Sequence, residues 1–152
     1  MQARMNAFQA APEMMKAVLA LSEAVKASGI DWKIKELVKT RASQINGCAF
    51  CIEMHTREAR AQGESEERLY LLSAWRESPL YTPRERAALA WTEALTLLAD
   101  THAPDDVYKE VRAHFTEQEL AELTVGIGLI NLWNRIQVGF RGVHPVKNAK
   151  AA

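Results

Sequence analysis

The chain has 152 residues, 48% of them hydrophobic, which is enough for one domain with its own core. Its 19 lysine and arginine residues balance 19 aspartate and glutamate residues, so the charge argues against a protein that binds nucleic acid or an anionic membrane. The most apolar stretch is far short of the ~20 residues of a membrane span, and the start lacks the apolar run of a secretory signal, so we expect a cytoplasmic protein without membrane contact.

Apolar residues recur with helical spacing along most of the chain, and no segment alternates convincingly with the period of a strand. The first predicted helix runs from Pro12 to Gly29, and the second from about Trp32 to Ile45. Asn46-Gly47 then supplies the left-handed residue with which helices often end. The third helix begins near Cys48 and ends at Gly63, and a fourth begins at Ser65 and ends at Pro79.

Two capping boxes mark later helix starts, one at Thr82-Pro-Arg-Glu85 and one at Thr116-Glu-Gln-Glu119. A shorter helix between them begins near Pro104 and extends through Phe115. The pattern predicts an all-α bundle of six to eight helices. We expect a single domain over residues 1–152, ordered from about 12 to 142, with a loose tail over 143–152.

The only two cysteines form a C-x-x-C pattern at the start of the third predicted helix. Unpaired N–H groups and aligned peptide dipoles in a first helical turn favour negative charge, so thiolates of Cys48 and Cys51 should be stabilised there. Disulfide-bonded residues usually have Cα atoms about 4.4–6.8 Å apart, which residues one turn apart can satisfy. His55 lies on the same helix face as Cys51 and can exchange a proton with it.

Glu36 lies on a polar stripe of the second predicted helix together with Thr40 and Ser43. If the second and third helices form an antiparallel pair, the rise of about 1.5 Å per residue places Glu36 roughly 15 Å and His55 roughly 10 Å from the turn. The two side chains can then meet, directly or through a water molecule. A carboxylate at this point would orient the imidazole and raise its basicity.

The chain resembles the alkylhydroperoxidase D-like, carboxymuconolactone decarboxylase-like family in one signature. This signature consists of Glu36, eleven intervening residues and Cys48-x-x-Cys51-x-x-x-His55. The preceding Ser43-x-x-Asn46-x-Cys48 is similar to the family pattern as well. The resemblance implies an all-helical fold and an alkyl hydroperoxide reductase without a cofactor or a metal. It also implies assembly as a homo-oligomer, either a trimer or a hexamer.

The resemblance implies a role for each residue of the motif. Cys51 would attack the peroxide, Cys48 would resolve the sulfenic acid to a Cys48–Cys51 disulfide, and Glu36 and His55 would form the proton relay. An external dithiol or thiol would then reduce the disulfide. Better-known peroxidases of the family have a second histidine immediately before the later cysteine, whereas this chain has Phe50 there.

Other functions remain open at this point. A zinc site could use Cys48, Cys51, His55 and Glu36 as ligands, in a structural or redox-sensing protein, although structural zinc sites usually contain two ligand pairs. A lactone decarboxylase or a general disulfide reductase would keep the fold with a different substrate. Decarboxylases of the family generally lack the cysteine pair, which favours thiol chemistry.

Two further sets of residues are predicted to be structural. Asn131, Asn134 and Arg135 interrupt an otherwise apolar helix, and buried polar groups need partners, so we expect them to tie this helix to a neighbour or to another subunit. Four tryptophans sit at helical spacing among aliphatic residues and are expected in the core or at a subunit interface: Trp32, Trp75, Trp91 and Trp133.

Overall fold

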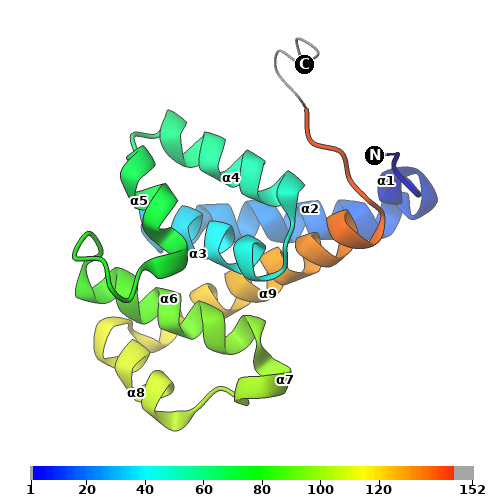
Figure 1. Ribbon diagram of the computed structural model, residues 1–152. Coiled ribbons are helices and arrows are strands. Elements are labelled where there is room, and N and C mark those ends of the chain that lie inside the picture. The colour runs from blue at the N-terminus through cyan, green and yellow to red at the C-terminus, as the bar shows by residue number, and fades with distance from the viewer. Residues whose placement is uncertain (1, 146–152) are drawn as a thin grey trace.

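The computed structural model describes residues 2–145, and all regular structure in that part of the chain is helical (Figure 1). The six helices of ten or more residues are α2 (Pro12–Ala27), α3 (Trp32–Ile45), α4 (Ala49–Ala61), α6 (Pro83–Thr96), α8 (Asp105–His114) and α9 (Glu117–Gly139). The shorter elements are α1 (Ala7–Ala10), α5 (Glu66–Leu71), the 3-10 turn η1 (Leu72–Ala74) and α7 (Leu98–Thr101). The predicted all-α fold is confirmed. No helix within residues 2–145 combines the length and apolar character of a membrane span.

Helix α3 lies at the centre of the bundle. Figure 1 shows it between α4 and α6, with α9 running alongside, and α3 contacts all three of these helices. It contributes to both buried apolar clusters, with Ile34 and Val38 in the larger cluster and Leu37 in the smaller one. Because its neighbours hold it on several sides, α3 gives its polar residues fixed positions.

The helices begin where the sequence places caps. The Thr82 hydroxyl accepts from the Glu85 N–H while the Glu85 carboxylate accepts from the Thr82 N–H, and Thr116 and Glu119 form the same reciprocal box before α9. Pro83 takes the first position of α6, where its missing N–H costs no helical hydrogen bond. Both predicted capping boxes are therefore confirmed.

The predicted fourth helix is shorter than expected. Its α-helical part ends at Leu71, a single 3-10 turn follows, and the chain from Trp75 to Pro79 is not helical. The Arg86 guanidinium of α6 donates to the carbonyl oxygens of Trp75, Arg76 and Ser78. The prediction to Pro79 was wrong: in the structure a side chain of α6, and not the backbone of a longer helix, pairs with the carbonyl groups of this segment.

Helix α2 lies along α9, and the segment before α1 reaches the C-terminal end of α9 (Figure 1). The Trp133 indole N–H donates to the Ser22 hydroxyl at 3.2 Å, and the Phe8 ring stacks on Trp133 with centroids 6.3 Å apart. The Arg4 N–H donates to the Phe140 carbonyl at 2.9 Å. Of the predicted tail, residues 143–145 have no regular structure, and residues 146–152 lie outside the described residues.

Candidate redox site

The turn between α3 and α4 presents both cysteines. Gly47 has a φ of 65°, which confirms the predicted left-handed residue after α3. The next residue, Cys48, is the N-cap of α4, and its sulfur accepts from the Cys51 N–H at 3.3 Å. The two sulfurs are joined in a disulfide with the Cα atoms 5.3 Å apart. The C-x-x-C therefore lies at a helix N-terminus, as the sequence predicts.

The two cysteines are equally buried but differ in what they face. Each is 1% exposed. Cys51 lines a cavity of about 880 Å³, whereas Cys48 does not belong to its lining. A molecule in this cavity would therefore contact Cys51 and not Cys48.

This cavity lies among α2, α3, α4 and α9. Large apolar side chains supply much of its wall: Trp32, Phe50, Met54, Leu123, Ile130 and Trp133. Its polar end is formed by Glu36, Lys39, His55 and Glu58, next to Cys51. Two of the four tryptophans thus line a cavity, while Trp75 and Trp91 are buried in the core as expected.

The structure brings Glu36 and His55 together across the α3–α4 pair. Their Oε2 and Nδ1 atoms are 3.4 Å apart, and the side chains belong to residues only 7% and 5% exposed. The Lys39 ammonium contacts the other oxygen of Glu36, Oε1, at 2.6 Å. Neither nitrogen of His55 nor Oε2 of Glu36 has a hydrogen-bond partner. Nδ1 faces the carboxylates, and Nε2 is left free.

A second carboxylate, Glu58, also faces His55. Its Oε2 lies 3.7 Å from His55 Nδ1, and its side chain is about half exposed. Sequence reasoning missed Glu58, although its position three residues after His55 places it on the same face of α4. The imidazole therefore stands between one buried carboxylate and one that reaches solvent.

The two carboxylates are both held in the ionised form. Burial raises the pKa of Glu36, but the neighbouring His55 and the Lys39 ammonium outweigh burial and leave that pKa below its ordinary value. His55 is the largest cause of the lowered pKa of Glu58, and it outweighs a partial burial that acts in the opposite direction. Negative charge thus persists beside the imidazole at neutral pH.

The predicted zinc set is not available in this oxidised form. Cys48 and Cys51 are bonded to each other, so neither offers a thiolate to a metal. Within residues 2–145, the side chains that converge as possible metal ligands are Glu36, His55 and Glu58. The candidate set therefore contains no cysteine.

Asparagines of α9 hold the turn that precedes Cys48. The Asn46 amide donates to Asn131 Oδ1 at 3.0 Å and to Asn134 Oδ1 at 2.8 Å, and the Asn134 amide donates to the Ser43 hydroxyl at 3.0 Å. The expectation that these asparagines tie α9 to a neighbouring helix is confirmed. They fix the end of α3 and so position the first residue of the disulfide.

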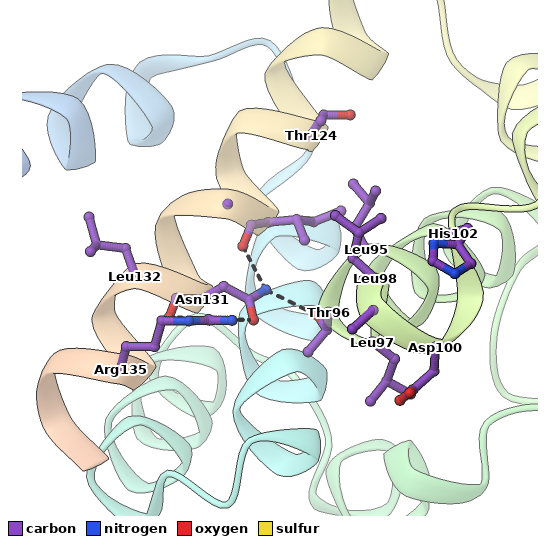
Figure 2. Close-up of a pocket in the computed structure, with 13 residues that line it drawn as sticks. Leu95, Thr96, Leu97, Leu98, Asp100, His102, Thr124, Asn131, Leu132 and Arg135 are labelled. Carbon is purple, nitrogen blue, oxygen red and sulfur yellow. Dashed lines mark hydrogen bonds between the residues drawn. The ribbon is translucent and has the colours of Figure 1, made fainter. Parts of the chain in front are cut away.

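Asn131 also connects α9 to α6 at a second pocket, which contains neither cysteine (Figure 2). Figure 2 shows its amide donating to the Thr96 hydroxyl, at 3.1 Å, and to the Ile127 carbonyl, at 3.0 Å. The Arg135 guanidinium donates to the Asn131 backbone carbonyl at 2.8 Å. This pocket is open and lies beside α7, away from the thiol chemistry.

Known proteins share this architecture. Residues 12–94, more than half of the chain, match the carboxymuconolactone decarboxylase family. The uncharacterized protein YdfG of Bacillus subtilis (strain 168) is 44% identical over 138 residues, covering 91% of this chain and 94% of that protein. A protein of unknown function from Agrobacterium tumefaciens, suggested to be the antioxidant defence protein AhpD, is 52% identical with a TM-score of 0.94, covering 96% of this chain and 100% of that chain.

A more distant structure shares the fold alone. The alkylhydroperoxidase AhpD core of an uncharacterized peroxidase-related protein from Ralstonia eutropha JMP134 is 18% identical, with a TM-score of 0.79 over 91% of this chain and 74% of that chain. The Agrobacterium tumefaciens structure agrees with the helical architecture of this chain. The chain therefore belongs to the carboxymuconolactone decarboxylase family and has the AhpD-like fold.

Proposed function

We propose that this protein is a thiol-dependent hydroperoxide reductase in which Cys51 attacks the peroxide. The observation that carries the proposal is the position of Cys51, which lines a large cavity beside His55 and Glu36 and is disulfide-bonded to Cys48. A redox-active dithiol needs one sulfur that meets the substrate and a second within bonding reach of it. The Agrobacterium tumefaciens relative, suggested to be the antioxidant defence protein AhpD, supports the same activity.

The first step oxidises Cys51 by two electrons. The Cys51 thiolate attacks the terminal oxygen of the hydroperoxide, the O–O bond breaks, and Cys51 becomes a sulfenic acid. The departing alkoxide takes a proton from the His55 imidazolium and leaves as an alcohol. Glu36 lies 3.4 Å from His55 Nδ1 and stabilises the imidazolium, because its carboxylate remains ionised.

The second step forms the disulfide and returns the oxygen as water. The Cys48 thiolate attacks the Cys51 sulfenic sulfur, the S–O bond breaks as the S–S bond forms, and the departing hydroxide takes a proton from solvent to become water. An external dithiol then reduces the disulfide by thiol–disulfide exchange and is itself oxidised, which closes the cycle. Before reaction, the N-terminus of α4 favours thiolates of both cysteines, since Cys48 is its N-cap and Cys51 lies in its first turn.

The lining of the cavity suits an organic hydroperoxide. A volume of about 880 Å³ lies within the range of small-molecule sites, and its wall is mainly apolar and aromatic. The polar end next to Cys51 can receive the peroxide group while Trp32, Phe50 and Trp133 contact an apolar substituent. Hydrogen peroxide would leave most of this surface without contact.

The proposal predicts different effects for substitutions of the two cysteines. Cys51→Ser should reduce dithiol-dependent consumption of an organic hydroperoxide by at least about 100-fold, because the cysteine that lines the cavity is lost and Cys48 does not belong to that lining. Cys48→Ser should still oxidise once, to a sulfenic acid detectable by mass spectrometry, but it should recycle poorly. In the unsubstituted protein, stoichiometric hydroperoxide should convert the reduced Cys48–Cys51 peptide to its disulfide form.

The same variants identify the opposite outcome. If Cys51→Ser consumes hydroperoxide at the original rate, the proposed role of Cys51 is wrong. If the protein decarboxylates a lactone and keeps this activity after both cysteines are replaced, it is instead a decarboxylase of the family. Circular dichroism on each variant checks that the helical fold is retained, so a loss of turnover is read as chemistry.

A further inference from the structure

Three ligand atoms converge at the contact between α3 and α4. Glu36 Oε2, His55 Nδ1 and Glu58 Oε2 all lie within 4.8 Å of one another. Two carboxylate oxygens and an imidazole nitrogen form a donor set typical of divalent transition metals. The set uses neither cysteine, so it does not depend on the redox state of the disulfide.

Hydrogen bonding does not account for this arrangement. His55 Nδ1 is 3.4 Å from Glu36 Oε2 and 3.7 Å from Glu58 Oε2, whereas a charge-assisted N–H···O bond is about 2.7–2.9 Å long. Both Nδ1 of His55 and Oε2 of Glu36 are buried and unpartnered. Buried polar atoms are rarely left without a partner, so these two atoms point to a further group between them.

The distances from His55 Nδ1 to the two carboxylate oxygens, 3.4 Å and 3.7 Å, are close to the spacing of ligands around a small cation. Tetrahedral ligands at about 2.0–2.1 Å from zinc stand about 3.4 Å from one another. We infer that Glu36, His55 and Glu58 bind a divalent transition-metal cation of the size and preference of Zn²⁺. Solvent supplies the remaining position, because Glu58 is about half exposed.

Lys39 is the charge that opposes this cation. Its ammonium contacts Glu36 Oε1 and leaves Oε2, the other oxygen of the same carboxylate, free to bind. With a neutral imidazole, the two carboxylates and Lys39 carry a net charge of about −1, which still attracts a divalent cation. Lys39 should therefore weaken the metal site without abolishing it.

The test is a titration of the oxidised protein, free of any affinity tag, with Co²⁺ at neutral pH. The disulfide keeps the sulfurs out of the measurement. We expect one equivalent to bind with the visible absorption of a tetrahedral cobalt site, and Zn²⁺ to displace it. Glu58→Gln should weaken binding at least about tenfold, as should His55→Gln. Glu53→Gln removes the same charge from an exposed ion pair with Arg57 on the same helix and should leave binding unchanged.

Lys39→Gln provides a test in the opposite direction, since removing the ammonium should tighten Co²⁺ binding several-fold. The inference is overturned if the unsubstituted protein binds no Co²⁺, or if Glu58→Gln binds it as tightly as Glu53→Gln does. Neither measurement involves turnover of a peroxide. A failure of the metal site is therefore distinguishable from a failure of the proposed peroxidase, which rests on Cys51.

Discussion

Two polar clusters on the α3–α4 pair differ in how they use hydrogen bonds. The amide cluster, which comprises Ser43, Asn46, Asn131 and Asn134, joins α3 to α9 through direct hydrogen bonds of 2.8–3.0 Å. The relay cluster, which comprises Glu36, His55 and Glu58, contains three buried atoms that have no hydrogen-bond partner, one on Glu36 and two on His55. The amide cluster consists of neutral side chains, whereas the relay cluster consists of ionisable ones.

This difference assigns the two clusters different physical tasks. Neutral amides with satisfied hydrogen bonds hold a fixed geometry and do not change charge, so the amide cluster is suited to position the turn that carries Cys48. Unpartnered ionisable groups cost stability, but they remain free to accept a proton or a cation. The comparison predicts that substitutions in the amide cluster affect folding, and that substitutions in the relay cluster affect chemistry.

The largest effect on folding is expected at Asn134, which is 1% exposed. Asn134→Ala removes the acceptor of one Asn46 N–H and the donor to Ser43, and it leaves a cavity in α9. We expect a loss of about 2–3 kcal/mol in the free energy of unfolding, because a buried group loses its partner and the space is not refilled. Urea denaturation of the oxidised protein measures this loss.

A matched control uses a surface amide of the same helix. Gln118 donates to Glu122 at 3.0 Å in an exposed pair, so Gln118→Ala should change the free energy of unfolding by less than about 0.5 kcal/mol. An equal effect of the two substitutions would show that the hydrogen bonds of Asn134 add nothing beyond a general effect of truncation. The assignment of the amide cluster to positioning would then be lost.

Glu36→Gln is expected to have a smaller effect, and mainly on reactivity. In reduced protein with Cys48→Ser, alkylation of Cys51 at neutral pH should slow about tenfold, because in the proposed relay the imidazolium beside the thiolate would lose its nearer carboxylate. Glu58 remains 3.7 Å from His55, which limits the change. The free energy of unfolding should fall by about 1 kcal/mol or less, since Lys39 is partly exposed and can be solvated.

The pH profile of the same alkylation sharpens this prediction. Its midpoint should move to higher pH in Glu36→Gln and stay in place in Glu53→Gln, which removes a partly exposed carboxylate of α4 that pairs with Arg57. An unchanged profile in Glu36→Gln would remove Glu36 from the proton relay. A large loss of stability with an unchanged profile would show that the relay cluster has a structural role. This outcome would contradict the expectation that substitutions in the relay cluster affect chemistry.

Local signals explain why much of the fold could be predicted from the sequence. The boxes at Thr82 and Thr116 and the left-handed Gly47 act within one turn of the chain, and the corresponding helix ends agree with the structure. The end of the fourth helix could not be predicted in this way. The segment that follows contacts Arg86 of α6, whose guanidinium donates to three of its backbone carbonyls, those of Trp75, Arg76 and Ser78.

For the candidate site too, local features of the sequence could be predicted and features that depend on the tertiary structure could not. The proximity of Glu36 and His55 follows from the rise of two antiparallel helices, and the structure places these side chains together. Glu58 could not be assigned because its role depends on the orientation of the His55 ring. Phe50 and Met54 were candidates for the wall of a pocket at the thiols, and both line the cavity. The extent of the cavity could not be predicted, since it requires α2 to pack along α9 through Trp133 and Ser22, residues far apart in sequence. The functional roles and the trimer or hexamer remain predictions.

The smallest effect is expected at the solvent side of the amide cluster. Thr96→Val removes the hydroxyl that accepts from Asn131, but Asn131 keeps its bond to the Ile127 carbonyl (Figure 2). Both Thr96 and Asn131 line the open pocket beside α7, so water can replace the lost acceptor. We expect a change of about 0.5 kcal/mol or less in urea denaturation. A loss as large as that of Asn134→Ala would contradict this account, because access to water would then not decide what a lost hydrogen bond costs.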